Sequence, residues 1–298
     1  MNKSLIPIMA CLVLASTLLP LSSFATSTIN ATNRYAWGAN IGWQDWRADG
    51  ANGVVIGQFV CSGYIYAANV GWIHLGDGSP ADGVQYQNNS ATDYGVNHEG
   101  DGRLRGFAYG ANIGWVQFED LGDPRVNLLN GELSGYAYGA NVGWINLNTA
   151  EPDGLVQADT MEPGLDTDGD GIPDAWEIVF FGGPTNANAS AMASNNVNTL
   201  LEAYIAGLDP HSTNDFLEIT AIDHLTVPDR KEITWSSKET RVYRLDGSTN
   251  LLEATDWIET DPPGQILPDP GTHTMRSVDD DAIDFRNFRV RVSVPLGP

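Results

Sequence analysis

The sequence predicts a mainly β protein in which a small helical module separates two β-rich parts. Three observations support this prediction. An aromatic motif recurs four times in the first half, an acidic loop with a helical pattern behind it occupies the middle, and alternating apolar and polar residues return in the last third. Alternation is typical of strands, and a spacing of three or four is typical of helices. The expected units are 26–158, 159–212 and 213–298, after a leader at 1–25.

The leader has the pattern of a secretory signal peptide. Lys3 is followed by an apolar run and by small residues that end at Ala25. No stop-transfer pattern follows, so we expect cleavage rather than anchoring. The mature chain is therefore expected to be secreted or held at the cell surface, without a transmembrane segment.

The composition limits the classes of partner. The 298 residues carry a formal net charge of −23 at pH 7, and so acidic a chain repels nucleic acid and attracts divalent cations. We therefore exclude nucleic acid as a partner. Beyond the leader, Cys61 is the only cysteine. This leaves no intramolecular disulfide and predicts a buried, unreactive thiol.

Unit 26–158 contains four copies of an aromatic hairpin motif. Each copy has two aromatic residues two positions apart, a small-residue turn and a closing tryptophan, as in Tyr35-Ala-Trp37-Gly-Ala-Asn40-Ile-Gly-Trp43. Residues two apart on a strand share one face, and Gly, Ala and Asn suit a tight reversal. Each copy therefore predicts strand, turn and strand. The four copies are 35–43, 64–72, 107–115 and 136–144.

The two ends of this unit complement each other. A short strand precedes the second, third and fourth hairpins but not the first, and residues 154–156 repeat that strand after the fourth. We therefore expect a closed β-array, propeller-like or prism-like, in which 28–37 lies beside 153–158. An open β-solenoid of the same four hairpins is the alternative.

The repeated aromatic residues allow two interpretations. Identical positions in every repeat favour rings that stack into one continuous core. Flat rings also bind the faces of sugars, so a carbohydrate platform is the alternative. We favour the core, and we expect the repeated asparagines to form turns rather than to contact a ligand.

Residues 166–177 match the twelve-residue calcium loop D-x-[DN]-x-[DN]-G-x5-E at every specified position. Calcium prefers roughly six to eight oxygen ligands, and carboxylates at alternate loop positions supply several of them from one turn. Gly171 permits the sharp reversal in the middle of the loop. The predicted ligands are the carboxylates of Asp166, Asp168 and Asp170, the backbone carbonyl of Ile172, Asp174 directly or through water, and both carboxylate oxygens of Glu177.

A single helix is predicted beside this loop. Pro163 and Gly164 oppose a helix before it, whereas 174–181 shows helical spacing and ends at two glycines. This EF-hand-like loop with one outgoing helix resembles the calcium repeats of dockerins and thrombospondin type 3 segments in exported bacterial multi-module proteins. The resemblance covers residues 162–210 and implies a second loop and helix.

The second loop is degenerate. Residues 198–207 match the implied second helix and its glycine stop. With Glu202 in the twelfth position, Ala191 and Ala193 stand where carboxylates are required. We therefore expect one calcium ion per chain, bound by the first loop alone, and a stiff joint rather than a sensor that opens.

Unit 213–298 returns to alternating residues with Pro and Gly turns, which predicts an antiparallel β-sandwich. It resembles the fibronectin type III-like modules of secreted bacterial proteins. The predicted strands are 217–222, 232–235, 241–245, 256–258 and 288–294.

No catalytic motif is present. The five histidines are scattered, without H-E-x-x-H, and no G-x-S-x-G elbow occurs. The sequence favours a non-catalytic calcium-binding structural or adhesive protein, in which calcium stiffens the joint between two β modules and the partners are surface or matrix glycans or proteins. The alternatives are a carbohydrate-binding protein that uses the repeat aromatics and a secreted glycan-active enzyme.

Overall fold

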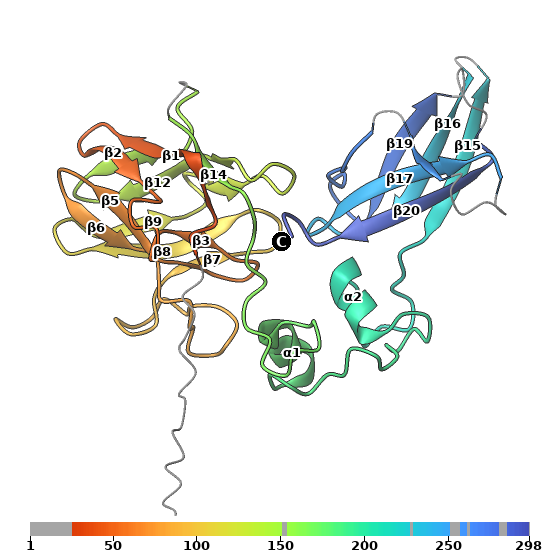
Figure 1. Cartoon of the computed structure of the whole chain (residues 1–298), viewed down its shortest axis with the longest axis horizontal. Helices are drawn as coiled ribbons and strands as arrows, with labels where there is room; N and C mark the ends of the chain where they lie inside the picture. Colours follow the sequence, from red (N-terminus) through yellow and green to blue (C-terminus); the bar gives the residue numbers. More distant parts are fainter. Residues whose placement is uncertain are drawn as a thin grey trace, which may run out of the picture.

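The computed structural model describes residues 26–150, 154–226, 229–250, 257–260, 263–279 and 285–297. The predicted leader, 1–25, lies outside these residues. The described chain forms a closed β-barrel, then two short helices, then two small sheets, and is mainly β as predicted (Figure 1). Within the described residues no helix is long and apolar enough to cross a membrane.

The barrel consists of eight antiparallel strands in four hairpins. Neighbouring hairpins pair with one another, and the last strand pairs with the first, so that Trp37 lies opposite Asn146. The predicted closure is confirmed, and the open solenoid is wrong. The strands are β1 (Ile29–Gly38), β2 (Gly42–Asp45), β5 (Tyr64–Ala67), β6 (Gly71–His74), β8 (Leu104–Gly110), β9 (Gly114–Phe118), β12 (Tyr136–Gly139) and β13 (Gly143–Asn146).

Short strands in the connections surround the barrel. Strand β14 pairs with β1, so Ile29 lies opposite Ala158 as the predicted meeting of 28–37 with 153–158 requires. Cys61 in β4 is free and fully buried, and burial raises the pKa of its thiol to about 12. The connecting strands are β3 (Val55–Ile56), β4 (Cys61–Ser62), β7 (Val96–His98), β10 (Arg125–Val126), β11 (Leu133–Ser134) and β14 (Val156–Ala158).

The repeat aromatics lie outside the barrel, so the prediction that they form its core is wrong. Most remain between 36% and 46% exposed. The interior holds the residues between them, such as Ala137 and Ile145, which alternation places on the opposite strand face. An eight-stranded barrel is just wide enough for its own side chains, which leaves room for aliphatic groups but not for twelve large rings. One end is plugged by Trp46, Leu75, Phe118 and Leu147, each three positions after a closing tryptophan.

A cyclic set of asparagine hydrogen bonds joins the four turns. Each turn asparagine donates its Nδ2–H to a backbone carbonyl in the turn of the neighbouring hairpin. The bonds are Asn69 to Ile41, Asn112 to Val70, Asn141 to Ile113 and Asn40 to Val142, at 3.0–3.1 Å. The last bond closes the ring over 102 positions of sequence. The expected turn formers therefore also fix the spacing of the hairpins.

The glycine that follows each turn is required by the same arrangement. Gly143, for example, has φ 77°, and a Cβ there would lie 3.3 Å from the Nδ2 of Asn40. Positive φ favours glycine, and a side chain would in addition crowd the asparagine amide. The turn itself has an i→i+3 bond from the Val142 amide to the Gly139 carbonyl, which suits a three-residue hairpin loop.

The two helices follow the prediction closely. Helix α1 (Asp174–Phe181) ends at Gly182, whose φ of 74° is left-handed and whose amide donates to Ile178. Helix α2 (Leu200–Ala206) begins at Thr199, which forms a capping box with Glu202, and ends at Gly207 with φ 69°.

The last unit is a small antiparallel β-sandwich of two three-stranded sheets. Trp235 of one sheet and Tyr243 of the other share a buried core with Ile233, Leu245 and Val278. Strand β19 was not predicted from the sequence. Of the predicted strand 256–258, position 256 lies outside the described residues. The resemblance to fibronectin type III modules stays a prediction. The sheets are β15 (Ile219–Thr226), β16 (Asp229–Ser236) and β19 (His273–Asp279), and β18 (Ile258–Glu259), β17 (Val242–Ser248) and β20 (Asn287–Ser293).

We predict that Asn40→Ala and Asn141→Ala destabilise the barrel by similar amounts. Each removes one hydrogen bond and leaves a carbonyl unpaired, which costs about 1 kcal/mol. Urea unfolding followed by tryptophan fluorescence measures the change. Ala140→Ser, at an exposed neighbour in the same turn, is the control. An unchanged midpoint for Asn40→Ala would show that the closing bond does not hold the ring.

Candidate metal centre and exposed aromatic surface

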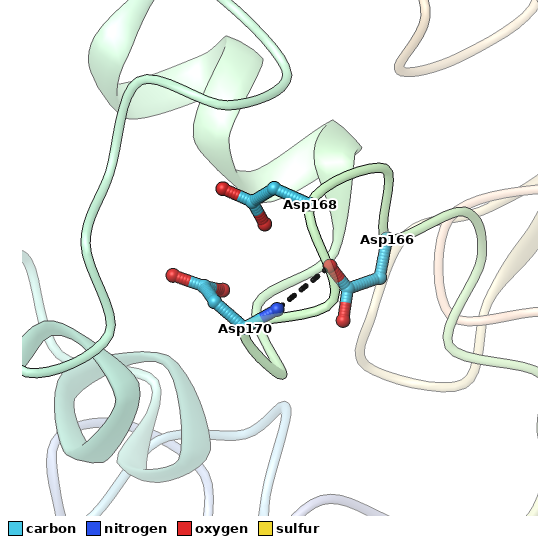
Figure 2. A group of neighbouring side chains, drawn as sticks. All are labelled: Asp166, Asp168 and Asp170. Carbon is cyan, nitrogen blue, oxygen red and sulfur yellow. Dashed lines mark hydrogen bonds between the residues drawn. The ribbon is translucent and has the colours of Figure 1, made fainter.

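The loop before α1 gathers three aspartates. The carboxylates of Asp166, Asp168 and Asp170 each offer an oxygen, and these oxygens lie within 4.8 Å of one another (Figure 2). Asp166 organises the loop, since its carboxylate accepts hydrogen bonds from the amides of Gly169, Asp170 and Gly171 at 2.8–3.2 Å. Gly171 has φ 94°, as the sharp reversal predicted at this position requires.

The remaining predicted ligands lie in or beside the start of α1. Ile172 is fully buried, and its amide donates to Asp170. Asp174 is bound to Thr167, whose amide and hydroxyl donate to its two carboxylate oxygens at 2.7 and 2.6 Å. Asp174 thus closes the loop onto the helix, and it is not part of the three-aspartate group.

Glu177 has the most informative environment of the six residues. It is fully buried, and its Oε1 accepts the amide of Ala187 at 2.7 Å. Its Oε2 is also buried and has no hydrogen-bond partner. Burial raises the pKa of this carboxyl, the charges of Asp168, Asp170 and Asp174 raise it further, and the Ala187 amide lowers it. A carboxylate in this position lacks a positive partner.

No Lys, Arg or His among the described residues supplies that partner. Five carboxylates lie within twelve residues, and none of the ion pairs among the described residues involves them. Asp168 makes no hydrogen bond within the described part of the chain. A buried unpaired acceptor is costly, and several oxygens from one loop suit a hard divalent cation. The three aspartates therefore fit a metal ion, whereas Glu177 lies outside their group, although the charges of Asp168 and Asp170 act on its carboxyl.

Side-chain hydrogen bonds hold the second loop. Asn195 is buried, and its amide group bonds Val197, Asn198 and the backbone carbonyl of Asp215. Asn196 takes the place of glycine with φ 55°. Glu202 is exposed and accepts the Thr199 amide as half of the capping box. Hydrogen bonds occupy the groups that a metal-binding loop would direct at its ion.

The helical module lies between the two β modules (Figure 1). The hydroxyl of Tyr204 in α2 donates to Gln58 of the barrel unit at 2.8 Å. Arg241 of the sandwich donates to the carbonyls of Tyr204 and Ile205 at the end of α2, where a cation is favourable. The module core around Trp176 also contacts Phe59 of the barrel unit and Val292 of the sandwich. The three units therefore share one junction.

A pocket of about 320 Å³ lies at this junction, and it bears on the enzyme alternative. Glu99 is the only acidic residue in its lining, whereas a glycosidase needs two carboxylates about 5–10 Å apart. His98 is buried and bonded on both ring nitrogens, to the Gly57 carbonyl and the Gly102 amide. Burial lowers its pKa to about 4. Nothing in this pocket lining favours glycan hydrolysis.

The outside of the barrel carries a cluster of rings on each hairpin. In the fourth hairpin, the ring centroid of Trp144 lies 4.9 Å from that of Tyr138, directly across the strands, and 6.1 Å from that of Tyr136. Trp43, Trp72 and Trp115 have equivalent neighbours at 4.8–4.9 Å. The closest pairs are tilted by 56–62°, a geometry that aromatic quadrupoles favour. The rings thus hold one another in place while much of each remains accessible.

A polar residue that the motif did not single out accompanies each cluster. It lies two positions after the closing tryptophan and shares the outward face with it. On one side it pairs with an aromatic residue of its own hairpin and on the other with an aromatic residue of the next. The four residues are Asp45, His74, Gln117 and Asn146. The period-two pattern after each tryptophan was the signal for this position.

No protein-family model, curated protein or solved structure matches the chain. The resemblance to dockerin and thrombospondin type 3 repeats therefore stays a prediction. The function is inferred from the residues of this chain alone.

We predict that calcium titration by calorimetry gives one site per chain. Glu177→Gln is expected to weaken binding at least tenfold, because an amide cannot supply the second anionic oxygen. Glu202→Gln, the same change at the matching position of the second loop, is expected to leave the affinity unchanged, since glutamine still completes a capping box. Two equivalent sites, or an equal loss in both variants, would contradict this assignment.

Proposed function

We propose that the chain is a non-catalytic, exported calcium-binding protein of structural or adhesive type, in which calcium stiffens the joint between barrel and sandwich. The observation that carries the proposal is the three-aspartate group, together with the buried, unpartnered Oε2 of Glu177 in the helix that follows the loop. Calcium would be held by Asp166, Asp168, Asp170 and Glu177, with the Ile172 carbonyl completing the shell. Bound calcium supplies the positive charge that these carboxylates lack.

The position of the loop supports a role at the joint. Asp170 accepts the amide of Ala189, and Glu177 accepts the amide of Ala187. Both bonds tie the loop and α1 to the segment that leads into α2. Loss of the cation would leave repelling carboxylates on these tethers. Helices of eight and seven residues are not stable by themselves, so weaker tethers would loosen the contacts of α2 with both β modules.

We predict that chelation accelerates proteolysis at the joint. Calcium at a concentration about a hundredfold above its Kd stabilises the folded state by about 2.7 kcal/mol. After chelation, local unfolding of the joint should therefore become up to about a hundredfold more frequent. Chymotrypsin is the suitable protease because 160–185 contains aromatic residues and neither Lys nor Arg. Mass spectrometry of the fragments locates the cuts near Trp176 and Phe181.

Asp168→Asn in calcium should reproduce the effect of chelation, because its side chain has no other bond within the described chain. Cleavage within the barrel should not change, and it serves as the internal control. If cleavage at 160–185 is equally slow with and without calcium, the joint role is wrong while calcium binding stands.

A second candidate function is carbohydrate binding by the barrel. The observation that favours it is the outward position of the repeat aromatics, with each closing tryptophan 43–46% exposed. The closed ring of strands has no free edge for pairing with another chain, so the exposed side chains are the barrel's means of contact. Glycans of a surface or matrix are the partners that an exported adhesive protein would meet.

We predict that neutral polysaccharides retard the chain in affinity gel electrophoresis, and that EDTA leaves the retardation in place, since the barrel closes through its own bonds. A protein with an anionic surface of similar charge is the mobility control. If no polysaccharide slows the chain, the carbohydrate function is wrong and the calcium joint is unaffected.

A further inference from the structure

The four outward polar positions differ in what already occupies them. Asp45 accepts the Arg47 amide and forms an ion pair with Arg34, whose guanidinium also lies over the Tyr35 ring at 5.1 Å. His74 stacks on Tyr64 at 4.6 Å and bonds the hydroxyl of Tyr94.

The other two positions are more open. Asn146 uses its Oδ1 to accept the amide of Asn148. Gln117 is exposed, and its side chain makes no hydrogen bond within the described residues. Of the four polar residues, Gln117 on the third hairpin therefore has both its amide oxygen and its NH2 group available.

Gln117 lies in the middle of an aromatic row. It pairs across β8 with Phe107 and across β12 with Tyr138. Two strand spacings separate those aromatic residues, about 10 Å. Trp115 precedes it on the same face, with ring contacts to Phe107, Tyr109 and Tyr94. The amide of Gln117 is thus a free donor and acceptor with aromatic rings on both sides.

This chemistry suits a sugar chain better than the other occupants of an aromatic surface. A primary amide donates and accepts at once, as sugar hydroxyls do, and aromatic faces attract the polarised C–H groups of a pyranose. A peptide strand finds no free edge on a closed barrel. The chain has a net charge of −23 and therefore repels a second copy of itself and anionic polymers.

We propose that Phe107, Trp115, Gln117 and Tyr138 form a binding subsite for a neutral polysaccharide at the junction of the third and fourth hairpins. The proposal rests on the carbohydrate function above and assigns that function to one side of the barrel. The sugar lies across β9, with the Gln117 amide bonded to its hydroxyls and the rings stacked on its faces. At the equivalent junctions the polar residue is already bonded, Asp45 to Arg34 and His74 to Tyr94.

Calorimetry on the whole chain tests the subsite with hexasaccharides of β-1,4-linked glucose, mannose, xylose and N-acetylglucosamine, and with an oligogalacturonate as the anionic probe. At least one neutral hexasaccharide should bind. Trp115→Ala and Gln117→Leu should each weaken that binding at least tenfold. Trp43→Ala is the matched control, because Trp43 occupies the same place on the first hairpin with 46% exposure against 44%; it should change the affinity less than twofold.

The outcomes separate the subsite from the function. An equal loss in Trp43→Ala and Trp115→Ala, or no loss in Gln117→Leu, overturns the subsite and leaves carbohydrate binding by the barrel intact. Binding of the oligogalacturonate in preference to every neutral probe overturns the assignment to neutral glycans. If no probe binds, the subsite and the carbohydrate function both fail. Thermal unfolding of each variant checks the fold, and Gln117→Leu on an exposed strand face keeps the test valid if Trp115→Ala unfolds.

Discussion

The narrow interior of the barrel is the constraint on which the rest of the structure depends. Short strands closed into a ring of eight leave space for one small or medium-sized side chain at each inward position, and Ala36, Ile65, Ala108 and Ala137 occupy one level of it. The repeat aromatics must then face outward, where each packs on its neighbours across the strands, and only the end of the barrel admits the rings of Trp46 and Phe118. The cyclic asparagine bonds fix the distance between hairpins at the turn end. Closure thus explains both the small residues inside and the exposed aromatic surface outside.

Strands, turns and closure could be predicted because each has a local signal. Alternation gives the strand, Gly-Ala-Asn gives the reversal, and the complementary chain ends give the ring. The inward face could not be predicted, because both faces of each strand are apolar: Tyr136 and Tyr138 lie on one, Ala137 on the other. Hydrophobicity alone favours burying the tyrosines. The available volume decides against it, and that volume depends on the strand number and curvature of the closed ring, which no single repeat encodes.

The metal loop shows the same division between local and distant causes. Its three aspartates come together as the spacing predicted, because one turn carries all of them and Asp166 binds the backbone of that turn. Asp174 lies outside this group, and Thr167 donates to both of its oxygens, a contact that the motif does not specify. Its part in binding an ion, directly or through water, stays a prediction. The burial of Glu177 beneath the 183–190 segment likewise depends on contacts that the motif does not contain.

The two candidate functions occupy parts of the molecule with different means of stabilisation. The barrel has a continuous core and a hydrogen-bonded ring of turns, so it does not need the metal. The helical module has two helices of eight and seven residues, and its core is completed by Phe59 from one side and Val292 from the other. Such a module is ordered only while its neighbours hold it, and its carboxylates oppose that order unless a cation offsets them. A change in the loop should therefore alter the joint before it alters the aromatic surface. The cation would control the orientation of the barrel relative to the sandwich and not the ligand that the barrel binds.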